Sequence, residues 1–255
     1  MTNATNGNEP IIRLVNVTKR FGGLTAVSDV SLEVRRGEVV ALAGDNGAGK
    51  STLIKMISGV YRPDEGQIYL EEREITVASP MEARSLGIET IYQDLALCEN
   101  LDATVNFFFG REPMKRMFGI FKQVDRQHML AESQTVLDRL DIKIPNLHRP
   151  IRQMSGGQRQ AVAIARAVYW NAKLVIMDEP TAALGVPEQR KVHELVRTLR
   201  EQNVPVIIIS HNLQDIFAVA DRIIVMRRGQ KVGDVMAADV TGDDLVGLMV
   251  GAGEA

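Results

Sequence analysis

The sequence has 255 residues, of which 45% are hydrophobic and 24% are charged, as is typical of a globular protein. The formal net charge of −2, together with the lack of a basic block, gives no reason to expect nucleic acid or an anionic membrane surface as a direct partner. Cys98 is the single cysteine, which excludes an internal disulfide and a cysteine-based metal site and fits a reducing cytosol.

The N-terminal segment contains two predicted strands. Residues 1–10 are polar and lack a secretory signal pattern, so we expect them to be disordered. The apolar patterns at 11–17 and 27–34 predict strands. Phe21 lies between them on a glycine-flanked loop, where its ring either stacks on a nucleotide base or closes the rim of the core.

A phosphate-binding pattern follows. The segment 44–52, GDNGAGKST, fits G-x-x-x-x-G-K-[ST], with an apolar strand before it at 39–43 and a helix after it at 52–58. The glycines let backbone N–H groups converge on an anion, and the helix adds the positive end of its dipole. We expect Lys50 to reach the β- and γ-phosphates and Ser51 to bind Mg²⁺. The residues assigned to the nucleotide are Gly44, Asp45, Asn46, Gly47, Ala48, Gly49, Lys50, Ser51 and Thr52.

Further strands of an α/β sheet are predicted downstream. A turn at 63–66 leads to a strand at 67–70, then to a short helix at 80–86 and a strand at 88–92. Gln93 follows that last strand, at the carboxyl end where the ligand groups of an open α/β sheet collect. One glutamine is weak evidence by itself.

The pattern changes from residue 100 to residue 150. A helix start at 102–105 and an amphipathic helix at 125–140 are visible, and a strand pattern is not, so we predict an all-helical insertion. Its large apolar side chains form either a small core or, in part, an exposed docking patch for a partner helix. These side chains belong to Phe107, Phe108, Phe109, Met114, Met117, Phe118, Ile120 and Phe121.

Two further motifs follow the insertion. Ser155-Gly156-Gly157-Gln158 opens a helix at 161–169 and is either a plain helix cap or a second anion site. A buried strand at 174–177 ends in Asp178 and Glu179. Because side chains alternate along a strand, Asp178 can face Mg²⁺ while Glu179 acts as the general base on a water; the alternative is a solvated strand end.

The last third of the chain continues the alternation of helices and strands. A helix at 185–200 precedes an apolar strand at 204–209, a run that is far too short to cross a membrane. If the protein works at a membrane, another chain must span it. His211 follows this strand, where contact with a γ-phosphate is expected. A helix at 213–220, a hairpin at 222–226 and 231–235, and a helix at 243–250 complete the prediction.

Taken in order, these motifs resemble an ATP-binding cassette ATPase, the motor subunit of ABC transporters, over nearly the whole chain. The Ser-Gly-Gly-Gln segment is that family's own mark. The resemblance implies an α/β fold: a P-loop NTPase core with a mixed sheet at 11–99 and 151–255, and an antiparallel β subdomain. It further implies that the all-helical subdomain at 100–150 docks on a permease.

The resemblance also implies roles for single residues. Phe21 stacks on adenine, Gln93 senses Mg²⁺ and the γ-phosphate, and His211 is a γ-phosphate switch. The segment Ser155, Gly156, Gly157 and Gln158 closes on ATP bound to another subunit. The implied catalytic set is Glu179, His211, Gln93 and Lys50, and the implied Mg²⁺ set is Ser51, Gln93 and Asp178.

Partners follow from the same resemblance. ATP and Mg²⁺ are the expected cofactors, and a head-to-tail pair of identical chains forms two composite ATP sites. Permease subunits are direct partners, an extracytoplasmic sugar-binding protein is an indirect one, and nucleic acid is not expected. The expected place is the cytoplasmic face of the inner membrane, as a peripheral subunit.

Local sequences indicate a subgroup. Segments 92–95, 106–112 (NFFFGRE) and 181–184 look like bacterial monosaccharide importers of the ribose, xylose and fructose type, in a single-cassette version. Two positions depart from the family pattern: Met154 replaces a common leucine, and Gly185 stands where many cassettes carry an aspartate that contacts the opposite subunit.

Other functions stay open at this point. The same motor class serves branched-chain amino acid uptake and lipid export, and soluble cassette proteins act in translation or DNA repair. Tandem cassettes, coiled-coil inserts and basic arms, which are usual in the soluble class, are not visible. A nucleotide-binding scaffold without catalysis is the third class, and the presence of Glu179 and His211 argues against it.

Overall fold

The computed structural model describes residues 9–117, 121–182 and 184–251. Two compact units can be distinguished. Unit 1 comprises Met1–Gln93, Ala172–Pro180 and Val196–Ala255, and unit 2 comprises Asp94–Asn171 and Thr181–Leu195. The predicted disorder of residues 1–10 falls, for residues 1–8, outside the described residues. Pro10 is the first residue of strand β1.

Unit 1 contains a mixed six-stranded sheet in the order β12-β11-β3-β10-β9-β6. All neighbouring pairs are parallel except β11 with β12, which form an antiparallel hairpin. The central strands are continuous buried apolar runs, as expected for parallel strands covered on both faces. The strand bounds are β3 Val39–Ala43, β6 Ile88–Ile91, β9 Leu174–Asp178, β10 Val206–Ile209, β11 Arg222–Arg227 and β12 Gln230–Met236.

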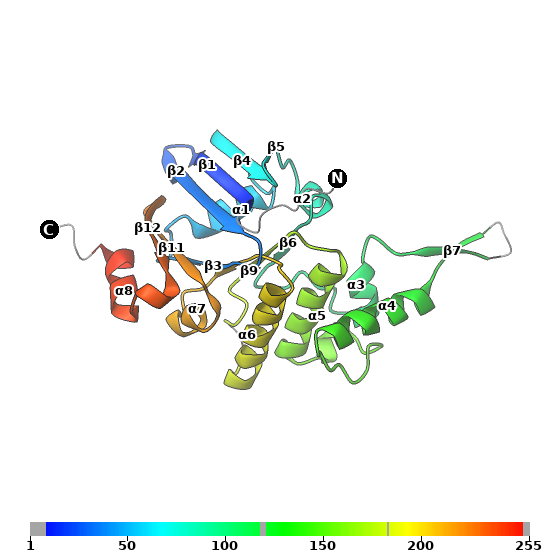
Figure 1. Ribbon diagram of the computed structural model, residues 1–255. Helices are drawn as coiled ribbons and strands as arrows, with labels where there is room; N and C mark the ends of the chain where they lie inside the picture. Colours follow the sequence, from blue (N-terminus) through cyan, green and yellow to red (C-terminus); the bar gives the residue numbers. More distant parts are fainter. Residues whose placement is uncertain (1–8, 118–120, 183, 252–255) are drawn as a thin grey trace, which may run out of the picture. The chain divides into compact units, whose positions relative to one another are not determined.

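The second sheet of unit 1 is antiparallel, with the order β2-β1-β4-β5 (Figure 1). Its strands are β1 Pro10–Phe21, β2 Leu24–Arg35, β4 Glu65–Leu70 and β5 Arg73–Ile75. β1 and β2 confirm the two predicted strands and extend them, whereas the three-residue β5 was not predicted. One hydrophobic core is shared by residues of both sheets and of the helix that follows β3.

The helices of unit 1 confirm the predicted positions to within one or two residues. They are α1 Lys50–Ile57, α2 Pro80–Ser85, α7 Leu213–Val219 and α8 Gly242–Val250, with a 3₁₀ turn at Ala237–Asp239. Polar side chains accept from the first-turn N–H groups of three of them, since Ser79, Asn212 and Thr241 stand at the N-caps. These caps explain why α2, α7 and α8 begin where they do.

Unit 2 is built around three helices, α3 Ala103–Phe108, α4 Arg126–Arg139 and α5 Gly156–Tyr169, with a 3₁₀ turn at Ile151–Gln153. A fourth helix, α6 Val186–Glu201, begins in unit 2 and ends in unit 1. Phe108, Tyr169 and Trp170 stack edge to face with ring centroids 4.8–6.0 Å apart. The Trp170 indole Nε1–H donates to the Phe107 carbonyl at 3.0 Å, so both α3 and the end of α5 belong to one small core.

The prediction of an all-helical insertion is wrong at one place. Met114–Met117 (β7) and Phe121–Val124 (β8) form an antiparallel two-stranded hairpin. These four-residue strands contain one β-branched residue, Val124, and no regular alternation, so sequence periodicity could not reveal them. Unit 2 is also larger than the predicted segment 100–150, because α5 packs with α3 and α4 and so belongs to this unit.

The apolar side chains of the insertion divide between a core and the surface. Phe107 and Phe108 are buried, while Phe109, Met114 and Phe121 are 58%, 54% and 64% exposed. Phe118, Ile120 and the side chain of Met117 lie outside the described part. A small core and an exposed apolar surface are therefore both present.

Candidate active site

The phosphate loop joins β3 to α1 in a backbone conformation that needs glycine. Gly49, the N-cap of α1, has φ +101°, and Gly44 has φ +143°. A Cβ on Gly44 would lie 2.2 Å from the Met226 carbonyl oxygen, and one on Gly49 would lie 2.5 Å from the Ala26 carbonyl oxygen. The backbone thus packs closely against β2 and β11 while it turns.

Lys50 closes the loop from within. Its ammonium group donates to the carbonyl oxygens of Gly44, at 2.6 Å, and Asp45, at 2.9 Å, and the side chain is buried. Burial lowers the pKa of this lysine, while the carboxylates of Glu179, Asp45 and Asp178 act in the opposite direction. A buried ammonium held against the backbone of a glycine-rich loop, directly before a helix, fits a polyphosphate.

The other predicted residues follow neighbouring strands of the same sheet. β3, β10, β9 and β6 are adjacent and parallel, so their carboxyl ends lie along one edge. The loop follows β3, His211 follows β10 by two residues, Glu179 follows β9 directly, and Gln93 follows β6 by two residues. The fold therefore collects these groups at one edge, as predicted.

Glu179 and His211 are in direct contact. The His211 Nδ1 lies 2.8 Å from the Glu179 Oε1, and because an ionised carboxylate can only accept, Nδ1 carries the proton of this bond. Glu179 has φ +51°, a left-handed conformation that is uncommon for this residue type, and its N–H donates to the Ile209 carbonyl at 3.0 Å. The backbone turns sharply after Asp178, and this turn aims the Glu179 carboxylate at the histidine.

The environment of Asp178 suits a divalent cation. Burial raises the pKa of its carboxyl group, and the nearby Glu179 charge raises it further, against the smaller effects of Lys55 and Lys50. A cation at this place would relieve both costs. The described residues contain no cluster of three or more His, Cys, Asp or Glu side chains able to hold a metal. A carboxylate in this position can bind a cation such as Mg²⁺, which takes few protein ligands and completes its shell with phosphate and water.

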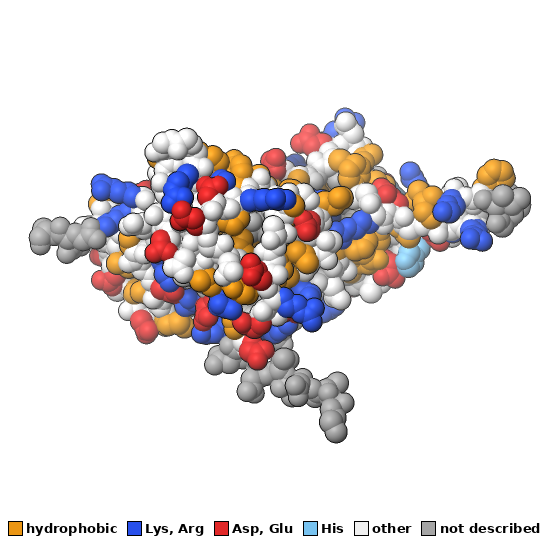
Figure 2. Space-filling model, turned by 90° about the horizontal axis from the view of Figure 1, so that it is seen from above, with side chains coloured by type: hydrophobic (Ala, Val, Ile, Leu, Met, Phe, Trp, Pro, Cys, Tyr) orange, Lys and Arg blue, Asp and Glu red, His pale blue; other side chains and the backbone are white. Residues whose placement is uncertain are grey.

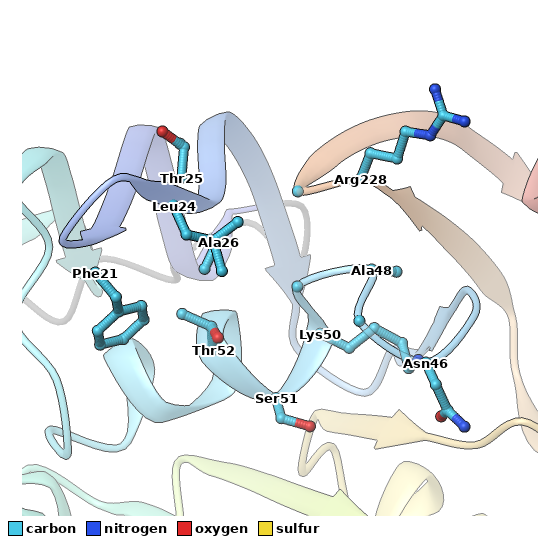
Figure 3. A pocket seen from close by; sticks show the side chains of 13 residues that line it. Phe21, Leu24, Thr25, Ala26, Asn46, Ala48, Lys50, Ser51, Thr52 and Arg228 are labelled. Carbon is cyan, nitrogen blue, oxygen red and sulfur yellow. The ribbon is translucent and has the colours of Figure 1, made fainter.

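A pocket of about 560 Å³ extends from the phosphate loop to Phe21 (Figure 3). Figure 3 shows the Phe21 ring at one end, Thr52 beside it, and Lys50 and Asn46 towards the other end. Phe21 is 41% exposed, and its ring stacks edge to face on Tyr61 with centroids 5.1 Å apart. A half-exposed ring held by a second aromatic at the mouth of a pocket favours the stacking alternative over the core alternative.

Two walls of this pocket were missed by the sequence analysis. Leu24–Ala26 of β2 line one side, and Arg228 and Gly229 of the turn between β11 and β12 line another. The Gly229 N–H donates to the Ala48 carbonyl at 3.0 Å, and its carbonyl accepts from the Ser28 N–H at 2.8 Å. Figure 3 shows the Arg228 side chain directed away from the pocket, so the backbone of the turn forms this wall. No single segment of the sequence signals this wall, because it depends on β11 lying beside β3 in the sheet.

The Ser-Gly-Gly-Gln segment lies in unit 2 and caps α5. The Ser155 hydroxyl accepts from the Gln158 N–H at 3.3 Å, and the Gln158 side chain accepts from the Ser155 N–H at 3.0 Å. This reciprocal capping box confirms the helix-cap alternative. It leaves the N–H groups of Gly156 and Gly157 at the positive end of a fourteen-residue helix, which is what the anion-site alternative requires.

Leu184, which precedes α6, and Glu188 in its first turn pack over the two glycines. A Cβ on Gly156 would lie 2.6 Å from the Leu184 Cδ2, and one on Gly157 would lie 2.8 Å from the Glu188 Cγ. The Glu188 carboxylate in turn reaches within 3.0 Å of where a Gly185 Cβ would stand. The acidic side chain of Glu188 thus lies beside Gly185, where many cassettes carry an aspartate.

Comparison with known proteins shows the family to which the chain belongs. Residues 27–182 match the model of the family described as ABC transporter. A xylose/arabinose import ATP-binding protein of Sulfolobus acidocaldarius is 50% identical over 86% of this chain and 86% of its own length. A fructose import ATP-binding protein of Rhizobium meliloti is 46% identical over 96% of both chains.

Solved structures agree with this match. The ADP conformation of MJ1267, an ATP-binding cassette of an ABC transporter, is 28% identical with a TM-score of 0.82 over 96% of this chain and all of that one. A dimeric structure of MJ0796, a bacterial ABC transporter cassette, is 26% identical with a TM-score of 0.73, and it covers 89% of this chain and 98% of that one.

Proposed function

The chain belongs to the ABC transporter family, and we propose that it is the ATP-binding and ATP-hydrolysing subunit of an importer for a monosaccharide. The observation that carries the hydrolytic part is the contact between Glu179 and His211, which follow the adjacent strands β9 and β10; β10 lies beside β3, the strand that leads into the phosphate loop. The cargo class is supported by the xylose/arabinose and fructose import proteins, which are 50% and 46% identical to this chain.

Nucleotide binding is assigned to three parts of unit 1. Phe21 stacks on the base, the N–H groups of 44–52 surround the phosphates, and Lys50 exchanges its two carbonyl acceptors for phosphate oxygens. The hydroxyl of Ser51 and the side chains of Gln93 and Asp178 would hold Mg²⁺. When bound, the ion supplies positive charge to the phosphate oxygens.

Glu179 is assigned as the general base for the attacking water. Its carboxylate accepts from the His211 Nδ1–H, which orients it and keeps one oxygen occupied, so that the second oxygen is available to a water. His211 is the more exposed partner, with a side chain 68% exposed against 17% for Glu179. An exposed imidazole can turn from the carboxylate to a γ-phosphate, and this movement is the proposed switch.

The segment 155–158 is assigned to the nucleotide of a second copy. A head-to-tail pair places each such segment on the partner's site, which gives two identical composite sites with two-fold symmetry. ATP then joins the subunits and hydrolysis releases them. The dimeric MJ0796 cassette supports such a pair.

We place the chain as a peripheral subunit on the cytoplasmic face of the inner membrane, bound to permease subunits that receive sugar from an extracytoplasmic binding protein. Within the described ranges no helix is both long and apolar enough to cross a bilayer. The solute path then belongs to other chains, and this chain supplies the energy.

The test is a mild-detergent pull-down of the tagged chain from its native membranes, followed by transport in vesicles rebuilt from the recovered proteins. We expect a polytopic permease to be recovered, and uptake of a pentose or hexose that needs ATP on the side of this chain. Recovery of soluble partners alone, or uptake of an amino acid or lipid instead of sugar, would overturn the assignment.

A further inference from the structure

The hairpin of unit 2 carries an unusual combination of exposed side chains. We define the hairpin surface as residues 114–116 and 121–124. Met114 and Phe121 are 54% and 64% exposed. Lys115, Arg116 and Lys122 are exposed as well, and the two segments contain no acidic residue. The hairpin surface thus carries three positive side chains. The formal net charge of the whole chain, −2, does not reveal this local cluster.

Two of these cations face each other across the hairpin. The register places Arg116 directly opposite Lys122, so both side chains lie on the same face of the two-stranded sheet. Like charges at directly opposed positions destabilise an antiparallel pair. Among the described residues neither cation has a hydrogen-bond or ion-pair partner, whereas Lys115 has Asp125 at 3.5 Å. The arrangement is one that an external anion would stabilise.

Exposed apolar and cationic groups occur on both faces of the hairpin. Met114 shares one face with the opposed cations, while Phe121 shares the other face with Lys115. β7 and β8 pack chiefly on each other, and Figure 1 shows them extending away from α3 and α4 of the same unit. Figure 2 shows hydrophobic atoms beside Lys and Arg atoms at this part of unit 2. Because these groups occur on both faces of the described strands, they fit a fluid interface, which can surround both faces.

From these observations we propose that the hairpin surface binds the headgroup layer of an anionic phospholipid membrane. Arg116 and Lys122 pair with lipid phosphates, and Phe121 enters the boundary between headgroups and acyl chains, with Met114 behind it. The inference goes beyond the proposed function, since it depends on neither the nucleotide nor the cargo. It also revises the conclusion drawn from net charge, which spoke against an anionic membrane surface.

The test is co-sedimentation of the full chain with vesicles of phosphatidylcholine alone or with added phosphatidylglycerol. We expect binding only when phosphatidylglycerol is present, and release as salt screens the charges. The double variant Arg116→Gln/Lys122→Gln is expected to lower the partition constant about 25-fold, about fivefold for each cation removed. Arg116→Lys, which keeps the charge, should bind as the original chain does, and Phe121→Ser should weaken binding without changing the salt dependence.

The matched control is Arg190→Gln/Lys191→Gln, which removes two exposed cations from α6 in unit 2. This control should bind vesicles normally. All variants should keep the original ATP turnover, and unchanged turnover would show that they are folded. An equal loss of binding in the control, or vesicle binding by the hairpin variant at the original level, would overturn the proposal. So would a hairpin variant that loses the permease in a pull-down while it still binds vesicles, since the surface would then dock a protein.

Discussion

Unit 1 and unit 2 differ in where the polar groups of their candidate sites find partners. In unit 1 the side chains Lys50, Glu179 and His211 come from three segments of the chain and meet at one sheet edge. In unit 2 the segment 155–158 satisfies its own side chains within a single helix cap. The fold of one chain thus assembles the unit 1 site, whereas the proposed role of the unit 2 segment needs a second chain that faces it.

The largest expected effect on nucleotide binding is a loss of affinity when the unit 1 site is disrupted. Lys50→Ala removes the buried ammonium that is assigned to the phosphates, so we expect nucleotide affinity to fall about 10- to 100-fold, the size typical of losing a charged hydrogen bond. Equilibrium binding of a fluorescent ATP analogue measures this. Lys231→Ala, which removes an exposed lysine paired with Asp234, is the control and should bind normally. Unchanged affinity in Lys50→Ala would place the phosphates elsewhere.

The second effect separates binding from hydrolysis. Glu179→Gln keeps the shape of the side chain but not its basicity, so turnover should fall by about 10²–10⁴-fold while affinity is retained. Steady-state phosphate release and light scattering in Mg-ATP check this, and we expect the variant to accumulate as a dimer. Glu72→Gln, at an exposed ion pair with Arg13, is the control. Ordinary turnover in Glu179→Gln would remove its role as the base.

The third effect tests whether the unit 2 segment acts on the nucleotide of a second chain. Ser155→Ala should leave nucleotide affinity at low protein concentration unchanged but reduce turnover about tenfold, because its hydroxyl is assigned to the partner's nucleotide. It should also cost about 1 kcal/mol of stability through the lost cap. Thr241→Ala removes the equivalent capping box of α8 in unit 1, and so matches the cap loss without touching the segment. If both variants lose turnover equally, the loss comes from the cap alone.

The smallest effect concerns pH. The pKa of Asp178 is raised above its ordinary value of 3.8, so the folded state holds this proton more firmly than the unfolded state. Stability from this group is fully present below pH 3.8 and is lost as pH rises through the raised pKa. Asp178→Asn should therefore gain stability at neutral pH, by less than about 1 kcal/mol because the carboxyl is only half buried. Denaturant unfolding of the nucleotide-free chain at pH 4 and pH 7 measures it, and an equal change at both values would contradict the assignment.

Prediction from sequence succeeded where local pattern decides structure. The apolar runs before the phosphate loop and before Asp178 are strands, as their short length and their β-branched residues favour in a parallel sheet covered on both faces. The turn at Gly229 and the residues 24–26 could not be assigned to the pocket, because strand order is not written in any one segment. The hairpin at 114–124 failed for the opposite reason: its strands pair only with each other and bury little, so their composition was free of the usual strand signature.

The single tryptophan of the chain gives this molecule an optical label. Trp170 stacks on Phe108 and Tyr169, donates to the Phe107 carbonyl, and has the Arg111 guanidinium 4.6 Å from its ring centroid. All of these partners lie in unit 2. Its emission therefore reports the melting of unit 2 alone, while circular dichroism follows both units. A difference between the two midpoints would reveal whether the halves of this motor unfold as one body or in sequence.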